Sequence, residues 1–288
     1  LGCEFFVTYL QLELKGVAYS LAVSHFIGLV ILLIYMSKSS YFKETYFPLE
    51  KESFRCLWKQ LKNESFVAAP NYLEWMANEI YTLIAASNFD SNQIVAWVVL
   101  YNIMAIMYMV PYGLGLCASI EAGNALGEKN ARKAKLTIRA TLYLSMIMIA
   151  IEIVVLYFVK TQFISLYNDD AEVIEIAVAL FDLYLIILPA DFLQINIMSI
   201  LKAIGKEHLT TALFVICYYI FGISTGYTFG VIKDMEVKGI LIGIGVGLYS
   251  LLISSSIALS STDMSAQIDI IHDRIDALKA ELLKSGYF

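Results

Sequence analysis

Long apolar segments are the feature that most constrains this chain. A membrane-spanning helix needs about 20 mostly apolar residues, because the hydrocarbon core of a bilayer is about 30 Å thick. Seven segments meet this need, at residues 16–36, 65–87, 93–118, 139–159, 174–201, 209–232 and 239–260. Lipid cannot hydrogen-bond a backbone, so helices are the expected form. The sequence predicts an all-α integral membrane protein, a polytopic bundle of about seven transmembrane helices.

Composition argues against several other classes of protein. Hydrophobic residues make up 59% of the chain and charged residues 16%, whereas soluble domains average about 45–50% and about 25%. The net charge of −6 argues against nucleic-acid binding, which needs clustered Lys and Arg. The four cysteines are far apart in sequence and form neither a zinc motif nor a disulfide framework. Because no catalytic or metal-ligand pattern occurs either, we expect neither an enzyme nor a cofactor.

The placement of Lys and Arg predicts the orientation of the chain. All but four of the 20 such residues fall in alternate connections: residues 37–64, residues 119–139, the turn at Lys202 and Lys206, and the C-terminal tail. Basic loops stay on the cytoplasmic side of a membrane. The first residue is therefore expected outside and the tail inside.

The tail itself, residues 263–288, has a different pattern. Apolar residues recur there at intervals of three and four, which predicts an amphipathic helix; they are Ile268, Ile271, Ile275, Leu278 and Leu282. Such a helix could lie on the membrane, pair with a partner helix, or pack on its own bundle.

Acidic residues inside the predicted spans are the main candidates for function. The five are Glu74, Glu79, Glu152, Asp182 and Asp191. No Lys or Arg lies deep in a predicted span to neutralise them, and a carboxyl group in an apolar environment without a cation tends to hold a proton. A proton-coupled carrier needs such a group. Glu74 and Asp191 rank first because they lie nearest the centres of their spans.

Prolines lie close to these acids. Pro70 and Pro189 precede Glu74 and Asp191 by four and two residues, and Pro111 lies late in the third span. Proline removes a helix hydrogen bond, and interrupted helices expose backbone groups at transporter binding sites. We therefore expect helix kinks at all three positions.

Aromatic and amide side chains in the spans suit an organic cation, which is attracted to carboxylates and to ring faces. The candidates for a substrate cavity are Trp75, Gln93, Asn102, Tyr184 and Tyr218. On the last span, Gly239, Gly243 and Gly247 are spaced by four, which favours close helix packing.

The stretch from Val110 to Gly127 carries a specific pattern. A proline-glycine helix segment runs into Ala118-Ser119, then into Gly123-Asn124-x-Leu126-Gly127, and a basic loop follows. This order resembles a signature of the multidrug and toxic compound extrusion (MATE) transporters.

Three further segments resemble the same family. Pro70-x-x-x-Glu74-Trp75 with Glu79 resembles its seventh helix, Asp191 with the turn at 201–205 resembles its tenth, and Tyr218-Tyr219-x-x-Gly222 resembles its eleventh. The resemblance covers nearly the whole chain, from the sixth to the twelfth span of the family.

The resemblance implies a domain organisation. Residues 1–36 would end the N-terminal lobe, 37–64 would be the cytoplasmic inter-lobe loop, 65–262 the six-helix C-terminal lobe, and 263–288 a cytoplasmic amphipathic tail. The chain begins at Leu1 rather than Met, and the remainder of an N-terminal lobe is an expected partner.

The resemblance also implies a function. Such a protein would be a secondary active antiporter in a lipid bilayer, exporting organic cations or other xenobiotics in exchange for H⁺ or Na⁺. The coupling acids would be Glu74, Glu79 and Asp191. The chain departs from the pattern at Gln93, where an acid is expected, and at Glu121, where Arg is usual, so the substrate and the ion stay open.

Two alternatives remain. A seven-helix receptor would share an outside start, seven spans and an inside tail, although its Asp-Arg-Tyr and Asn-Pro-x-x-Tyr motifs are missing from this sequence. A truncated, non-transporting MATE remnant would share every feature described above.

Overall fold

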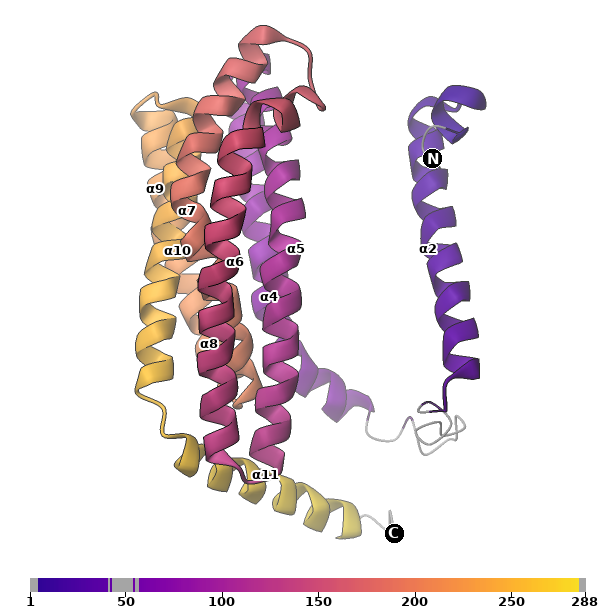
Figure 1. Ribbon diagram of the computed structural model, residues 1–288, viewed down its shortest axis with the longest axis vertical. Coiled ribbons are helices and arrows are strands. Elements are labelled where there is room, and N and C mark those ends of the chain that lie inside the picture. Colours follow the sequence, from indigo (N-terminus) through magenta and orange to yellow (C-terminus); the bar gives the residue numbers. More distant parts are fainter. Residues whose placement is uncertain (1–4, 41, 43–53, 55–56, 285–288) are drawn as a thin grey trace. The chain divides into compact units, whose positions relative to one another are not determined.

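The computed structural model describes residues 5–40, 42, 54 and 57–284. Every regular element in these ranges is a helix (Figure 1). The chain divides into two compact units, one ending at Gln60 and the other beginning at Leu61. Half of the predicted loop 37–64 lies outside the described residues, as do Cys3 and Cys56.

The first unit contains a short π-helical turn, η1 (Phe5–Tyr9), and one long helix, α2 (Glu13–Lys38). A side chain at Gly16 would come within 2.8 Å of the carbonyl oxygen of Phe6, so η1 folds back closely on the start of α2. The 26 residues of α2 reach about 39 Å at 1.5 Å per residue, enough to cross a bilayer.

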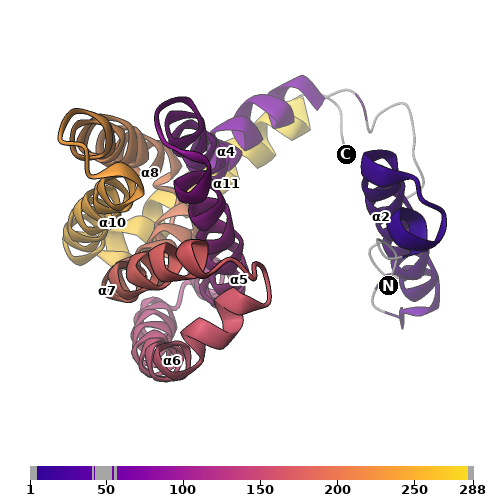
Figure 2. The same ribbon diagram turned by 90° about the horizontal axis from the view of Figure 1, so that it is seen from above.

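The second unit is a bundle of long helices. They are α4 (Leu57–Asn88), α5 (Ser91–Gly127), α6 (Ala131–Ser165), α7 (Ala171–Ala203), a composite helix over Glu207–Ile232, α10 (Glu236–Ser260) and α11 (Met264–Lys284). The composite helix alternates between α8 (Glu207–Phe214), η3 (Val215–Ile223), α9 (Ser224–Tyr227) and η4 (Thr228–Ile232), where η marks π-helix. Helix α7 packs against α5, α6, α8 and α10 (Figure 2).

The predicted spans agree with these helices, with one qualification. In the described part of the chain, six helices are long and apolar enough to cross a membrane: α2 from Lys15, α5, α6, α7, the composite helix and α10. The segment predicted at 65–87 lies in α4, whose 32 residues are long enough. However, α4 is too polar to meet the same hydropathy criterion, because it carries Asn71, Glu74, Asn78 and Glu79.

Several helices begin earlier than hydropathy predicts, because polar side chains cap them. Asp90 accepts a hydrogen bond from the backbone nitrogen of Gln93, and Asn130 accepts one from that of Lys133. Asp170 caps α7 in the same way. These caps satisfy backbone donors that the first turn of a helix leaves free.

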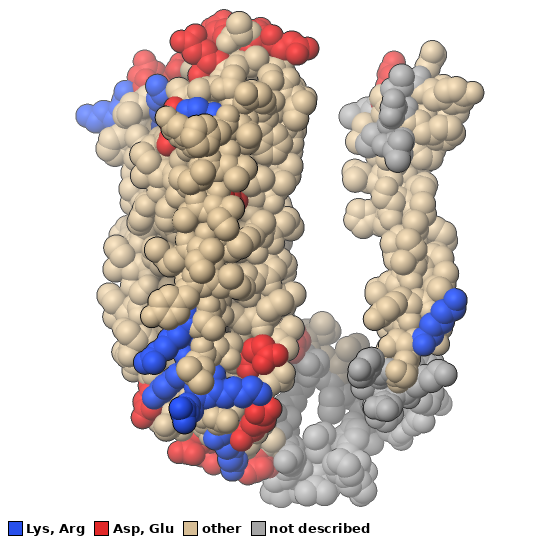
Figure 3. All heavy atoms as spheres, in the orientation of Figure 1, with Lys and Arg blue, Asp and Glu red and all other residues tan. Residues whose placement is uncertain are grey.

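Charged residues gather at the two ends of the bundle. Figure 3 shows acidic side chains with a few basic ones at one end, many basic side chains mixed with acidic ones at the other, and a nearly uncharged band between them on this face. We call the end where α7 begins, with Asp169, Asp170 and Glu172, the acidic end. The end where α6 begins, with Arg132 and Lys133, is the basic end, which is the one predicted to be cytoplasmic.

The glycines of α10 pack directly on the composite helix. A Cβ atom at Gly239 would overlap the backbone of Gly230, and one at Gly243 would overlap Gly226 and approach the carbonyl oxygen of Gly222 to 2.7 Å. The glycine stripe predicted on α10 thus meets a second stripe, Gly222, Gly226 and Gly230, that the sequence analysis did not identify. Backbones can approach this closely only where both helices lack side chains.

The tail helix α11 lies across the basic end (Figure 1). Met264 and Ile268 are buried, and the side-chain amide of Gln267 donates to the carbonyl oxygen of Ile204 at 2.7 Å. The beginning of α11 therefore packs on its own bundle, which is one of the three placements predicted for this helix. The side chains of Leu278 and Leu282 lie outside the described residues.

Replacing Gly243 by Val should destabilise the bundle. The new side chain would meet backbone atoms that no rotamer change can move, and such overpacking costs about 1–3 kcal/mol or more. We expect the midpoint of thermal unfolding in detergent to fall by about 5 °C. Gly113→Ala is the matched control, since a Cβ atom there meets no atom within 4 Å; an equal fall in both variants would contradict the close contact.

Candidate functional site

Two of the predicted acids line the same pocket. Glu74 of α4 and Asp191 of α7 both line a cavity of about 50 Å³, which we call the carboxylate pocket. Its other lining residues are Trp75, Asn78, Tyr101, Met104, Ala105, Tyr108, Tyr218, Ile244 and Leu248. Two carboxylates in one low-dielectric pocket repel each other, so a proton or a bound cation there is favoured.

Tyr108 holds Glu74 in place. Its hydroxyl donates to a carboxylate oxygen of Glu74 at 3.0 Å, and its ring stacks on that of Tyr112 with centroids 5.9 Å apart. Glu74 is only 8% exposed. The bond fixes the rotamer of a charged group that the surrounding apolar side chains would otherwise leave without a donor.

A larger cavity adjoins the carboxylate pocket. It has a volume of about 370 Å³, within the range of small-molecule sites, and we call it the basic-end cavity. Its polar lining consists of Asn71, Glu74, Tyr112, Ser119, Gln194, Ser199 and Lys202. Glu74 lines both cavities, so one carboxylate faces both spaces.

Helical spacing explains how α4 serves both cavities. Asn71, Glu74 and Asn78 follow one another at intervals of three and four residues, which places them on one face of the helix. The hydroxyl of Tyr219 donates to the carbonyl oxygen of Leu73 at 2.9 Å. This bond ties the π-helical segment η3, which supplies Tyr218, to the turn of α4 that carries Glu74.

The three prolines do not interrupt their helices. Pro70, Pro111 and Pro189 lie inside continuous α4, α5 and α7. The irregular backbone occurs instead in the composite helix, which contains no proline. Kinks at the three prolines stay a prediction. The π-helical turns, which are common at functional sites, were not predicted from the sequence.

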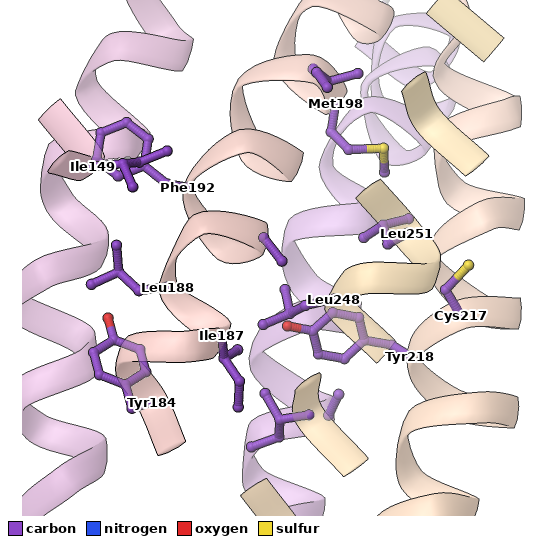
Figure 4. Close-up of a cluster of buried hydrophobic side chains, with 14 of the residues drawn as sticks. Ile149, Tyr184, Ile187, Leu188, Phe192, Met198, Cys217, Tyr218, Leu248 and Leu251 are labelled. Atoms are coloured by element: carbon purple, nitrogen blue, oxygen red, sulfur yellow. The ribbon is translucent and has the colours of Figure 1, made fainter. Parts of the chain in front are cut away.

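Four predicted site residues lie apart from these cavities. Glu79 and Asn102 are exposed, and the Asn102 amide donates to the carbonyl oxygen of Val98. Gln93 lines a separate cavity of about 230 Å³ at the acidic end and donates to Glu236 at 2.5 Å. Tyr184 is buried in the core, where Figure 4 shows it beside Leu188, whereas Tyr218 lies beside Leu248.

Two lysines lie closer to the acids of the predicted spans than the sequence suggested. Lys160 of α6 forms an ion pair with Asp182 of α7, which removes Asp182 from the candidates. Lys202 shares the basic-end cavity with Glu74. Glu152 keeps a buried carboxylate oxygen that no described residue hydrogen-bonds.

Sequence analysis missed Tyr108, Asn71, Gln194 and Lys202. Asn71 could have been found from its spacing to Glu74 and Asn78 on one helix face. Lys202 was counted only as a loop charge that sets orientation. Nothing in the sequence of α5 distinguishes Tyr108 from its neighbouring aromatics, because its partner lies on another helix.

The fold and the site define a class of protein. The chain is an all-α, multi-pass membrane protein whose interior holds a carboxylate pocket and a cavity of ligand size. The sequence profile of the MatE family matches residues 67–228, more than half of the chain. The chain belongs to this family, whose members are transporters, and the receptor alternative is thereby set aside.

Individual relatives agree with this assignment. Protein DETOXIFICATION 49 of Arabidopsis thaliana is 23% identical over 91% of this chain and 52% of its own length. Multidrug and toxin extrusion protein 2 of Mus musculus is 24% identical over 84% of this chain and 42% of its own. The chain spans about half the length of the curated relatives it matches.

Solved structures share the fold. The eukaryotic MATE transporter AtDTX14 superposes with a TM-score of 0.87 at 20% identity, covering 95% of this chain and 61% of the other. An outward-facing multidrug resistance MATE transporter gives a TM-score of 0.71 at 15% identity, covering 94% and 59%.

The basic-end cavity should admit water-soluble reagents. In a variant without native cysteines, Ser119→Cys, which lines the cavity, should react with a charged maleimide about tenfold faster than Ser145→Cys, since thiol labelling follows access. Ser145 is fully buried on α6 and provides the control. Equal labelling rates, measured by mass shift, would show that the cavity is closed to water.

Proposed function

We propose that this protein takes part in the export of organic cations in exchange for protons, with Glu74 and Asp191 as the coupling groups. The observation that carries the proposal is the position of Glu74, which lines the ligand-sized cavity and the carboxylate pocket that contains Asp191. A group that faces both spaces can hold either a substrate cation or a proton.

The exchange follows from competition for one charge. Ionised Glu74 attracts an organic cation into the basic-end cavity, because the cavity is partly shielded from water. A proton arriving at Glu74 removes that attraction and releases the cation. The driving force is the difference in substrate affinity between the two protonation states, as any two-state switch requires.

Other charged groups bear on this exchange. Lys202 lies in the same cavity, and its positive charge favours the ionised form of Glu74. Glu152 on α6 is a further carboxyl of the bundle. Three further points stay predictions. They are coupling to Na⁺ in place of H⁺, coupling through Glu79, and completion of the pathway by a further helical lobe of the same protein.

Glu74→Gln and Asp191→Asn should each abolish proton-driven export. Each amide keeps the shape of the carboxyl but can neither ionise nor bind a proton. The measurement is efflux of ethidium from vesicles that carry the protein, under an inward pH gradient. We expect the efflux rate to fall at least about tenfold, because each variant loses one buried charged contact.

Asp182→Asn is the matched control for this experiment. It changes a carboxyl of the same helix that is already paired with Lys160 near the acidic end, and ion pairs of this partly exposed kind contribute little. Efflux should stay within about twofold of wild type. If wild-type efflux depends on a Na⁺ gradient and not on the pH gradient, the coupling ion is Na⁺. If it depends on neither gradient, the antiport proposal is wrong and the non-transporting MATE remnant is favoured.

Tyr108→Phe should weaken cation export without abolishing it. Loss of the hydroxyl removes one hydrogen bond to a charged group, worth about 1.5–3 kcal/mol, so the proton affinity of Glu74 rises and the cation competes less well. We expect the pH at which efflux is half maximal to rise. Tyr143→Phe, at an exposed position of α6, serves as control and should leave the pH profile unchanged.

A further inference from the structure

The basic-end cavity contains one positive and one negative side chain that do not pair with each other. Glu74 and Lys202 are the charged residues in its lining. Two ion pairs join described residues of the bundle, Lys133 with Glu128 and Lys160 with Asp182, and neither includes Glu74 or Lys202. The ammonium of Lys202 donates instead to the side-chain oxygen of Asn71 at 2.6 Å, a neutral partner.

The two charges are offset along the axis of the bundle. Helix α4 runs from the basic end to the acidic end (Figure 1), and Asn71 precedes Glu74 by about one turn, or about 4.5 Å of rise. Because Lys202 contacts Asn71, its ammonium lies on the basic-end side of Glu74. A molecule entering from the basic end meets the positive charge first and the negative charge beyond it.

Gln194 also lines the cavity but does not add to the positive side. It is 2% exposed and its side chain lies beside the carboxylates of Glu74 and Asp191. The cavity therefore offers the ammonium of Lys202 as a donor and the carboxylate of Glu74 as an acceptor.

A simple organic cation would satisfy only half of this arrangement. It would neutralise Glu74 but leave Lys202 without a counter-charge and add repulsion between two positive groups in a partly enclosed space. A ligand with a cationic group and an anionic group would neutralise both.

We propose that the basic-end cavity selects zwitterions, with their cationic group at Glu74 and their anionic group at Lys202. This inference rests on the proposed function and specifies its substrate class. Lys202 is then a specificity-determining residue, whose effect depends on whether the ligand carries a negative charge.

A pair of probes that differ only in that charge tests the proposal. N-benzylnicotinate is a pyridinium carboxylate, and its methyl ester is the corresponding cation. Equilibrium binding of both, tritiated, is measured on the protein in nanodiscs, with empty nanodiscs subtracted. The readout is the ratio of the dissociation constant of the ester to that of the acid.

In Lys202→Gln this ratio should fall about tenfold or more, because the acid loses one charge-assisted hydrogen bond that the ester does not make. Lys202→Arg keeps the charge and should keep the ratio, which separates charge recognition from a general structural effect. Lys206→Gln, which changes a lysine bonded to Thr262 outside the cavity, should also leave it unchanged. An unchanged ratio in Lys202→Gln, or an equal fall in Lys206→Gln, would overturn the proposal.

Glu74→Gln separates this proposal from the proposed function. The variant should weaken both probes, because both carry the cationic group. If it weakens neither, the cation site at Glu74 is wrong, whatever the effect of Lys202. If it weakens both while Lys202→Gln leaves the ratio unchanged, the cation site stands and the zwitterion selectivity fails.

Discussion

Every polar group within the apolar band of this protein has to find a partner inside the protein, because lipid offers none. This constraint accounts for the main features of the bundle. The described backbone is bonded almost entirely within helices. Side chains follow the same rule: Trp97 donates to Thr82 at 3.1 Å, Lys160 pairs with Asp182, and Tyr108 donates to Glu74. Among the described residues the exceptions are one buried side-chain atom each of Tyr81, Glu152, Gln194 and Asn196.

Close packing elsewhere positions this polar interior. The two glycine stripes bring the composite helix against α10, and residues of both helices, Tyr218, Ile244 and Leu248, close one side of the carboxylate pocket. Tyr219 then anchors the same segment to α4 beside Glu74. The pocket is thus built where the glycine contact lies next to α4, the helix that carries Asn71, Glu74 and Asn78.

Much of the fold could be predicted from the sequence, because hydropathy reports directly on the solvent around a helix. The helix count, the candidate acids Glu74 and Asp191, and the glycine stripe of α10 all followed from residue type and spacing. The partners of those groups did not, because they lie on other helices: Tyr108 opposite Glu74, Lys160 opposite Asp182, and Gly226 opposite Gly243. Proline was also a poor guide to irregular backbone, since α4, α5 and α7 continue through it. A missing donor weakens one bond of a long helix, which neighbouring helices can compensate.

The π-helical segment Val215–Ile223 has a consequence for how this protein can evolve. Its wider turns accommodate residues that a regular α-helix would not hold at the same length. Removing a single residue between Tyr218 and Gly222 would change both the rise and the rotation between the tyrosine and the glycines that follow, since every residue of a helix contributes to both. Tyr218 would be displaced in the pocket even though no residue lining it had changed. Selection on this segment should therefore act on its length more strictly than on its apolar side chains, and single-residue deletions here should be rarer in descendants of this gene than substitutions.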